Sequence, residues 1–144
     1  RNALVEIWQP DAAGVFRHPL DPRCAEADPG FFGWGRARTD TDGRYWFRTV
    51  LPGAYATEDG AMRCPHLNLM LLAIGLTRRL VTTVFFADEQ GPVSDPVLDS
   101  VADPERRARL FAVREKVSNG DGALPVYRFD IVTRGEAETP FFVD

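Results

Sequence analysis

A histidine and an asparagine stand two positions apart in the apolar segment RCPHLNL, residues 63–69. In a β-strand alternate side chains share a face, so His66 and Asn68 are predicted to project together. Two imidazoles placed in this way could both reach one metal ion. One imidazole and one amide form a poorer pair, because an amide carbonyl is a weak ligand for a transition metal. The segment therefore indicates either an incomplete metal site or a hydrogen-bonded core histidine.

The composition is that of a single globular domain, which we assign to residues 1–144. The 17 Lys and Arg residues and 21 Asp and Glu residues give a net charge of −4 without any block of like charge, so a nucleic-acid partner is not expected. No apolar stretch approaches the roughly 20 residues of a membrane span, and the first residues lack the layout of a signal peptide. We expect a cytoplasmic protein that has no membrane partner. Cys24 and Cys64 are predicted to be free thiols.

Short β-favouring runs separated by turn residues dominate the chain. Strands are predicted over residues 3–9, 36–50 with a hairpin turn at Asp42-Gly43, 65–75, 78–88, 126–135 and 140–143. The loop over residues 10–34 is long enough to indicate a functional or interface role. One helix is predicted, with Asp103 as its N-cap and the segment 104–116 as its body. The predicted fold is mainly β, a β-sandwich with one short inserted helix.

Five segments, EIWQPDAAG, TDTDGRYWFRTVLPGAY, RCPHLNL, VYRFDIVTRG and GEAETPFF, occur in an order and at separations that resemble the intradiol ring-cleaving dioxygenases. The resemblance runs from about Glu6 to Phe142. It implies a prealbumin-like β-sandwich and a non-haem Fe(III) ion held by two tyrosines and two histidines. It also implies pairs of related chains, of which one keeps the iron, acting on a catechol-type aromatic acid and O2.

The resemblance places the four ligand positions on Phe16, Tyr55, His66 and Asn68. A phenyl ring has no donor atom, and an amide cannot supply the basic nitrogen of a histidine, so two of the four ligands are missing. The chain therefore resembles the member of the pair that has lost its iron. This implies that no metal and no catalytic residue remain here, and that a homologous partner chain binds the Fe(III). Arg63 matches an arginine that stabilises charge on the substrate in the catalytic chain.

These five residues form a candidate vestigial site, and the segment FFGW supplies candidate interface residues, Phe31, Phe32 and Trp34. Other interpretations stay open for each. Tyr55 could pack over the turn at Pro52-Gly53, Arg63 could satisfy loop carbonyls or an interface carboxylate, and the FFGW aromatics could cap the sandwich internally. We also expect the chain to lack an N-terminal arm that the family directs toward its partner.

Two rival functions remain. A self-sufficient dioxygenase-like metalloprotein would use Tyr55, His66 and an unidentified carboxylate, and it would carry stoichiometric metal. A non-catalytic prealbumin-like binding domain would be a stable monomer without a partner.

Overall fold

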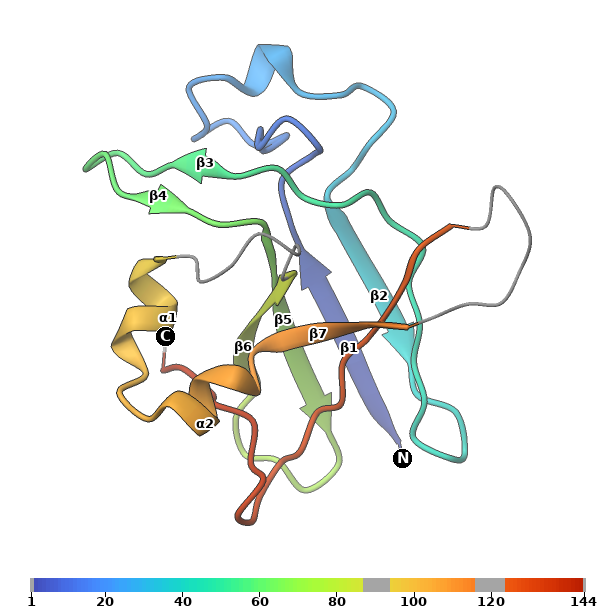
Figure 1. The fold of residues 1–144 in the computed structure, drawn as a ribbon. Coiled ribbons are helices and arrows are strands. Elements are labelled where there is room, and N and C mark those ends of the chain that lie inside the picture. The colour runs from blue at the N-terminus through green and yellow to red at the C-terminus, as the bar shows by residue number, and fades with distance from the viewer. Residues whose placement is uncertain (1, 87–93, 116–123, 144) are drawn as a thin grey trace.

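The protein is described from a computed structural model that covers residues 2–86, 94–115 and 124–143. Within these ranges the chain forms eight strands and three short helices (Figure 1). The strands are β1 (Ala3–Trp8), β2 (Trp34–Arg38), β3 (Tyr55–Ala56), β4 (Met62–Arg63), β5 (His66–Ala73), β6 (Leu80–Phe86), β7 (Phe111–Glu115) and β8 (Val126–Arg128). The helices are η1, a 3-10 turn (Cys24–Glu26), α1 (Pro96–Ser100) and α2 (Pro104–Ala108).

One curled sheet organises the fold. Its strand order is β2-β1-β5-β6-β7-β8, and every pairing is antiparallel except the parallel pair β6 and β7. Figure 1 shows β7 crossing over the first strands of the sheet. Strands β3 and β4 form a separate small hairpin beside the start of β5.

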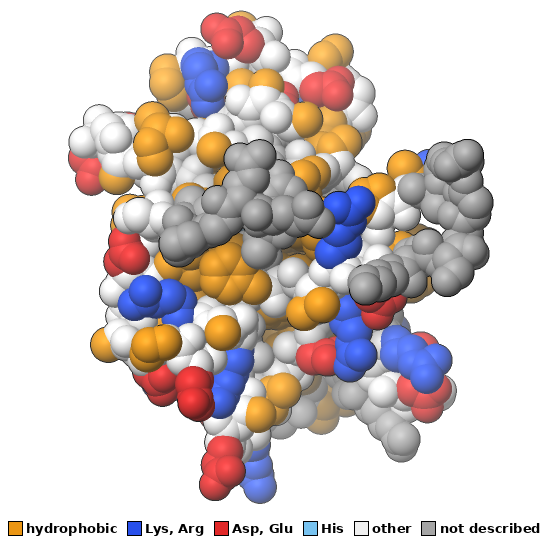
Figure 2. Space-filling view, in the orientation of Figure 1, with side chains coloured by type: hydrophobic (Ala, Val, Ile, Leu, Met, Phe, Trp, Pro, Cys, Tyr) orange, Lys and Arg blue, Asp and Glu red, His pale blue; other side chains and the backbone are white. Residues whose placement is uncertain are grey.

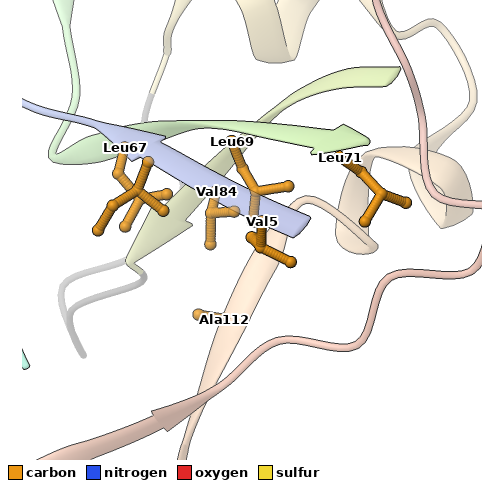
Figure 3. Packing of buried hydrophobic residues seen from close by; sticks show 7 residues of the cluster. Val5, Leu67, Leu69, Leu71, Val84 and Ala112 are labelled. Atoms are coloured by element: carbon orange, nitrogen blue, oxygen red, sulfur yellow. The ribbon is translucent and has the colours of Figure 1, made fainter. Parts of the chain in front are cut away.

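The core lies between the central strands and the chain segments that cover them. Buried aliphatic residues of β1, β5 and β6 pack with Ala112 of β7 in one cluster (Figure 3). Tyr45 and Phe129, in two covering segments, pack against the same cluster, and the Tyr45 hydroxyl donates to the Phe129 carbonyl over 2.8 Å. Burying each large side chain contributes about 1.5–3 kcal/mol. The predicted mainly β, sandwich-like fold is confirmed.

The predicted strands at residues 3–9, 65–75 and 78–88 are confirmed as β1, β5 and β6, with a turn at Gly75. Residues 87 and 88 lie outside the described part of the chain. The predicted hairpin over residues 36–50 is half right. Its turn forms, with the Asp40 amide donating to the Arg44 carbonyl, but residues 44–50 make no strand. This arm instead packs aromatic side chains onto the face of the sheet.

The prediction of one helix reaching residue 116 is wrong. Helix α2 ends at Ala108, and Phe111–Glu115 is strand β7. The Phe85 amide of β6 donates to the Leu110 carbonyl over 2.8 Å, and the Phe85 and Phe111 rings lie 5.8 Å apart. Long-range pairing therefore overrides the local helical pattern. The predicted cap is correct, since the Asp103 carboxylate accepts from the Glu105 amide. Residue 116 is not described.

Two further differences concern the C-terminal part. The predicted strand 126–135 is reduced to β8, and the predicted strand 140–143 is reduced to an isolated bridge between Val81 and Phe142. A second short helix, α1, also appears where none was predicted. Among the described residues, none of the helices has the length and apolar character needed to cross a bilayer.

Candidate functional site

The loop after β1 and the segment before β3 approach each other through two glycines. The Gly53 amide donates to the Asp11 carbonyl over 2.9 Å. A Cβ atom on Gly14, which has φ +75°, would overlap the Ala54 carbonyl, and one on Gly53 would overlap the Gly14 amide. Only glycine fits at both positions. This backbone contact brings Phe16, two residues after Gly14, against Tyr55, two residues after Gly53.

Asp11 fixes the loop that carries Phe16. It is buried, and its carboxylate accepts from the amides of Ala13, Val15 and Asp28 over 2.9–3.0 Å. Burial acts to raise the pKa of this carboxyl, but the three amide donors outweigh it and hold the pKa below its usual range. The Phe16 amide is held in turn by the Asp21 carboxylate at 2.8 Å. The loop is therefore closed by charge-assisted hydrogen bonds to backbone.

The structure brings three of the four predicted ligand positions together. The rings of Phe16 and Tyr55 lie 5.1 Å apart edge to face, and those of Tyr55 and His66 lie 5.6 Å apart. Beyond His66, the ring of Phe85 follows at 5.5 Å. Asn68 lies two residues further along β5, and its Oδ1 accepts from the Thr83 hydroxyl over 3.3 Å.

His66 is buried and has a defined tautomer. Its Nδ1 lies 2.6 Å from the Cys64 carbonyl, which can only accept, so Nδ1 carries the proton and Nε2 exposes a lone pair. None of the described residues is a hydrogen-bond partner of Nε2. Burial lowers the pKa of the imidazole to about 4, and the Arg63 charge adds to the lowering. The side chain is therefore neutral at physiological pH, with a free acceptor nitrogen.

Arg63 is anchored by a buried carboxylate of its own chain. Its Nε donates to Asp95 over 2.9 Å, and the same carboxylate accepts from the amides of Cys64 and Val97. Burial acts to raise the pKa of Asp95, but these donors hold it below its usual range. Asp95 also caps α1, which is why that helix begins there. The sequence interpretation placed a carboxylate partner of Arg63 at an interface, whereas the structure shows one within the chain.

Tyr55 pairs with Arg63 across β3 and β4. Burial raises the pKa of the Tyr55 phenol, against the opposing effect of the nearby Arg63 charge. The phenol therefore remains protonated at neutral pH. A tyrosinate ligand would have to form against this burial.

The donor set does not fit a four-ligand ferric site. Phe16 has no donor atom, and the amide oxygen of Asn68 already accepts from Thr83. The guanidinium of Arg63 places positive charge near the two remaining donors, Tyr55 and His66. Among residues 2–86, 94–115 and 124–143, His, Cys, Asp and Glu side chains form no group of three that could hold an ion.

The candidate interface residues lie at the start of β2 and in the loop before it. Phe31 is half-buried, whereas Phe32 is 74% exposed and Trp34 is 52% exposed. Arginines cover both exposed rings, with the Arg17 guanidinium 4.9 Å from the centre of Phe32 and that of Arg36 5.2 Å from Trp34. Figure 2 shows exposed hydrophobic side chains interspersed with charged ones on the visible face of the molecule.

The sequence analysis missed the two buried aspartates that hold this site. Both carry a local signal. The stretch PDAAG around Asp11 is typical of a turn in which an aspartate accepts from the amide two residues later, and Asp95-Pro96 is a helix N-cap followed by proline. Their burial could not be inferred from these signals, because it depends on contacts with distant residues.

Comparison with known proteins places the chain among ring-cleaving enzymes. A family model described as Dioxygenase matches residues 1–135. The chain is 38% identical to the protocatechuate 3,4-dioxygenase beta chain of Burkholderia cepacia, with 97% of this chain and 60% of that one covered. It is also 38% identical to the alpha chain of Pseudomonas putida, with 99% and 67% covered, and to the alpha chain of Burkholderia cepacia, with 98% and 68% covered.

The chain thus spans between three fifths and two thirds of the length of these relatives. Identity alone does not separate the alpha from the beta type, because all three values are equal. The family model and the relatives agree over nearly the whole chain. This chain belongs to the intradiol ring-cleavage dioxygenase family.

Proposed function

We propose that this chain is the non-iron alpha subunit of a protocatechuate 3,4-dioxygenase. In the proposed assembly, a homologous beta subunit holds the active site at which protocatechuate, a catechol-type aromatic acid, is opened by O2 to 3-carboxy-cis,cis-muconate. The Fe(III) bound by that partner would supply Lewis acidity toward the substrate. The present chain would contribute scaffold and part of the wall, and it would be inactive alone in the cytoplasm.

One observation carries the choice of the alpha over the beta type. The Phe16 ring, which lacks any donor atom, lies against Tyr55 at 5.1 Å in the place where the resemblance requires a tyrosinate ligand. A phenyl ring cannot be converted into a ligand by any movement of the chain. The engagement of the Asn68 amide with Thr83 supports the same conclusion for the second lost ligand.

The exposed aromatic residues supply a candidate contact with the beta subunit. Phe32 and Trp34 leave large apolar rings at the surface, and such residues are enriched in the centres of protein interfaces. The arginines over the two rings add donors that suit a polar rim. We propose that the FFGW segment, residues 31–34, contributes to the interface between the subunits.

Metal analysis of the isolated chain and of the assembly tests the proposal. The chain expressed alone and dialysed should hold far less than one iron per molecule, whereas the assembly purified with its partner should hold about one iron per pair, because only the partner has the full ligand set. The partner should carry two tyrosines and two histidines at the ligand positions. About one iron per isolated chain would contradict the proposal.

The interface is tested by a charged substitution and a matched control. Phe32→Asp should reduce assembly with the beta subunit in size-exclusion chromatography while the circular dichroism spectrum stays unchanged, since the ring is exposed. Trp46→Asp is the control, because Trp46 is 81% exposed but lies outside the FFGW segment. Equal effects of the two substitutions would argue against a specific role of this segment.

A further inference from the structure

Two buried polar atoms in the candidate site have no hydrogen-bond partner. They are Nη2 of Arg63 and Nε2 of His66, and they are the only buried side-chain nitrogen or oxygen atoms in this condition within the described part of the chain. Leaving such a group unpaired costs about 1–3 kcal/mol. Both unpaired atoms belong to the candidate site, so the described residues alone do not satisfy its polar side.

The chemistry of the two atoms restricts the molecule that could pair with them. Nε2 of His66 must accept, because the proton lies on Nδ1, which donates to the Cys64 carbonyl. Nη2 of Arg63 must donate. A hydroxyl group can satisfy both, by donating its hydrogen and accepting at its oxygen. A carboxylate cannot, because it would face the lone pair of Nε2 without a hydrogen to offer.

The charge balance favours a neutral molecule. The Arg63 guanidinium already faces the buried Asp95 carboxylate, so the site needs no further anion. An added negative charge would be buried near Asp95, and burying an unpaired charge is strongly unfavourable. A neutral hydroxyl avoids this cost.

Aromatic rings lie on both sides of His66. The ring of His66 lies between those of Tyr55 and Phe85, at 5.6 and 5.5 Å, and the ring of Phe16 follows beyond Tyr55. Such rings favour contact with another planar ring. Phe16 and Tyr55 are only half-buried, so this side of the site reaches the surface.

We propose that this site binds a neutral molecule of the phenol class, whose hydroxyl donates to Nε2 of His66 and accepts from Nη2 of Arg63. Both polar atoms of this site belong to the chain itself. The inference goes beyond the proposed function, which assigns no ligand to this chain.

Three small probes separate the contributions of ring and hydroxyl. Phenol carries both, benzene carries only the ring, and cyclohexanol carries a hydroxyl without a planar ring. Calorimetric titration of the full chain should show phenol binding at least about tenfold more tightly than either of the others, because each loses one of the two contributions. Equal affinities for phenol and benzene, or no binding of phenol, would overturn the proposal.

Nitrogen-15 NMR reports on His66 directly, because the chain has only two histidines and His18, in the loop after β1, is an internal control. Phenol should shift the Nε2 resonance of His66 upfield, as expected for a nitrogen that begins to accept a hydrogen bond, and leave His18 unchanged. A His66 resonance that is already upfield in buffer and does not move would show that a water molecule supplies the hydroxyl, which would overturn the proposal for an organic ligand.

A conservative variant tests Arg63. Arg63→Lys keeps a positive charge for Asp95 but removes the second donor, so the preference for phenol over benzene should fall severalfold while benzene affinity stays unchanged. Arg36→Lys is the matched control, because Arg36 is exposed on β2 and distant in sequence from the site. An undiminished phenol preference in Arg63→Lys would overturn the assignment.

Discussion

Two buried aspartates hold the two sides of the candidate site, and they do so in different ways. Asp11 lies in the loop that carries Phe16, and its carboxylate is satisfied by three backbone amides from that same loop. Asp95 lies at the start of α1, far along the chain, and it is satisfied by two backbone amides and the Arg63 guanidinium. The first side is closed by local backbone contacts, whereas the second depends on an ion pair between distant segments.

The difference coincides with what each side of the site has kept. On the Asp11 side a hydrocarbon ring, Phe16, replaces the expected ligand and leaves no polar atom to satisfy. On the Asp95 side the polar residues Arg63 and His66 remain, and each has one buried atom that pairs with none of the residues the structure describes. At Phe16 the lost ligand therefore leaves no polar atom to satisfy, whereas Asn68, the other lost ligand position, still carries an amide that accepts from Thr83. Arg63 pairs with the buried Asp95 carboxylate, which ties it to the stability of the fold.

Asp95→Ala should have the largest effect. It leaves the Arg63 guanidinium without its carboxylate in a buried position, so the free energy of unfolding should fall by about 3–5 kcal/mol. Urea denaturation measures the loss. Asp103→Ala is the matched control, because Asp103 also caps a short helix but is exposed, and its loss should cost only about 1 kcal/mol. Similar losses for the two variants would mean that Asp95 acts only as a cap.

The pH dependence of stability tests the Asp95 side of the site through His66. The pKa of His66 is lowered by burial from 6.5 to about 4, so between these values the unfolded chain binds a proton that the folded chain does not. Stability should therefore fall by about 3 kcal/mol as the pH decreases from 6.5 to 4. Urea denaturation across this window, compared with His66→Gln, isolates the contribution. If both proteins show the same slope, His66 is not buried as a neutral group.

Asp11→Asn should have a smaller effect. Asparagine keeps one acceptor oxygen for Ala13 and Val15 but turns an amide group toward the Asp28 amide, so about 1–2 kcal/mol should be lost. Thermal unfolding followed by circular dichroism measures the change. A loss as large as that of Asp95→Ala would remove the distinction drawn between the two sides.

The sequence predicted the elements whose pattern is local. The alternation in ALVEIW and the nearly continuous apolar runs around residues 66–73 and 80–86 correspond to β1, β5 and β6. The sequence-based prediction was wrong at FAVRE, residues 111–115, whose charged and apolar residues also fit a helix. This segment is a strand because it pairs in parallel with β6. The arm at residues 44–50 failed for a related reason, since its side chains and not its backbone join the sheet.

The candidate site was predicted in part. The resemblance named Phe16, Tyr55, His66 and Arg63, and the structure brings these residues together. Neither the resemblance nor the residue pattern indicated that Asp95 would anchor Arg63, because the two residues are 32 positions apart and their pairing depends on the packing of α1. The unpaired state of Nε2 of His66 likewise follows from the tautomer, which only the contact with the Cys64 carbonyl defines.

The smallest structural change tests whether the two sides still form one site. Phe16→Tyr and Asn68→His together would restore two donors, one on each side, without moving the backbone that Asp11 and Asp95 hold. Given Fe(III), the double variant should develop a visible tyrosinate-to-iron charge-transfer band that each single variant shows only weakly, since each leaves the ligand set incomplete. Activity is not expected to return, because surrounding hydrogen bonds that support ligands commonly change metal affinity or activity by about 10- to 100-fold.

The nearby Arg63 charge opposes the metal, so combining the double variant with Arg63→Met should strengthen the band. A double variant that folds, stays colourless and binds no iron would show that the four positions do not converge, and the correspondence between them and the ligand set would have to be withdrawn.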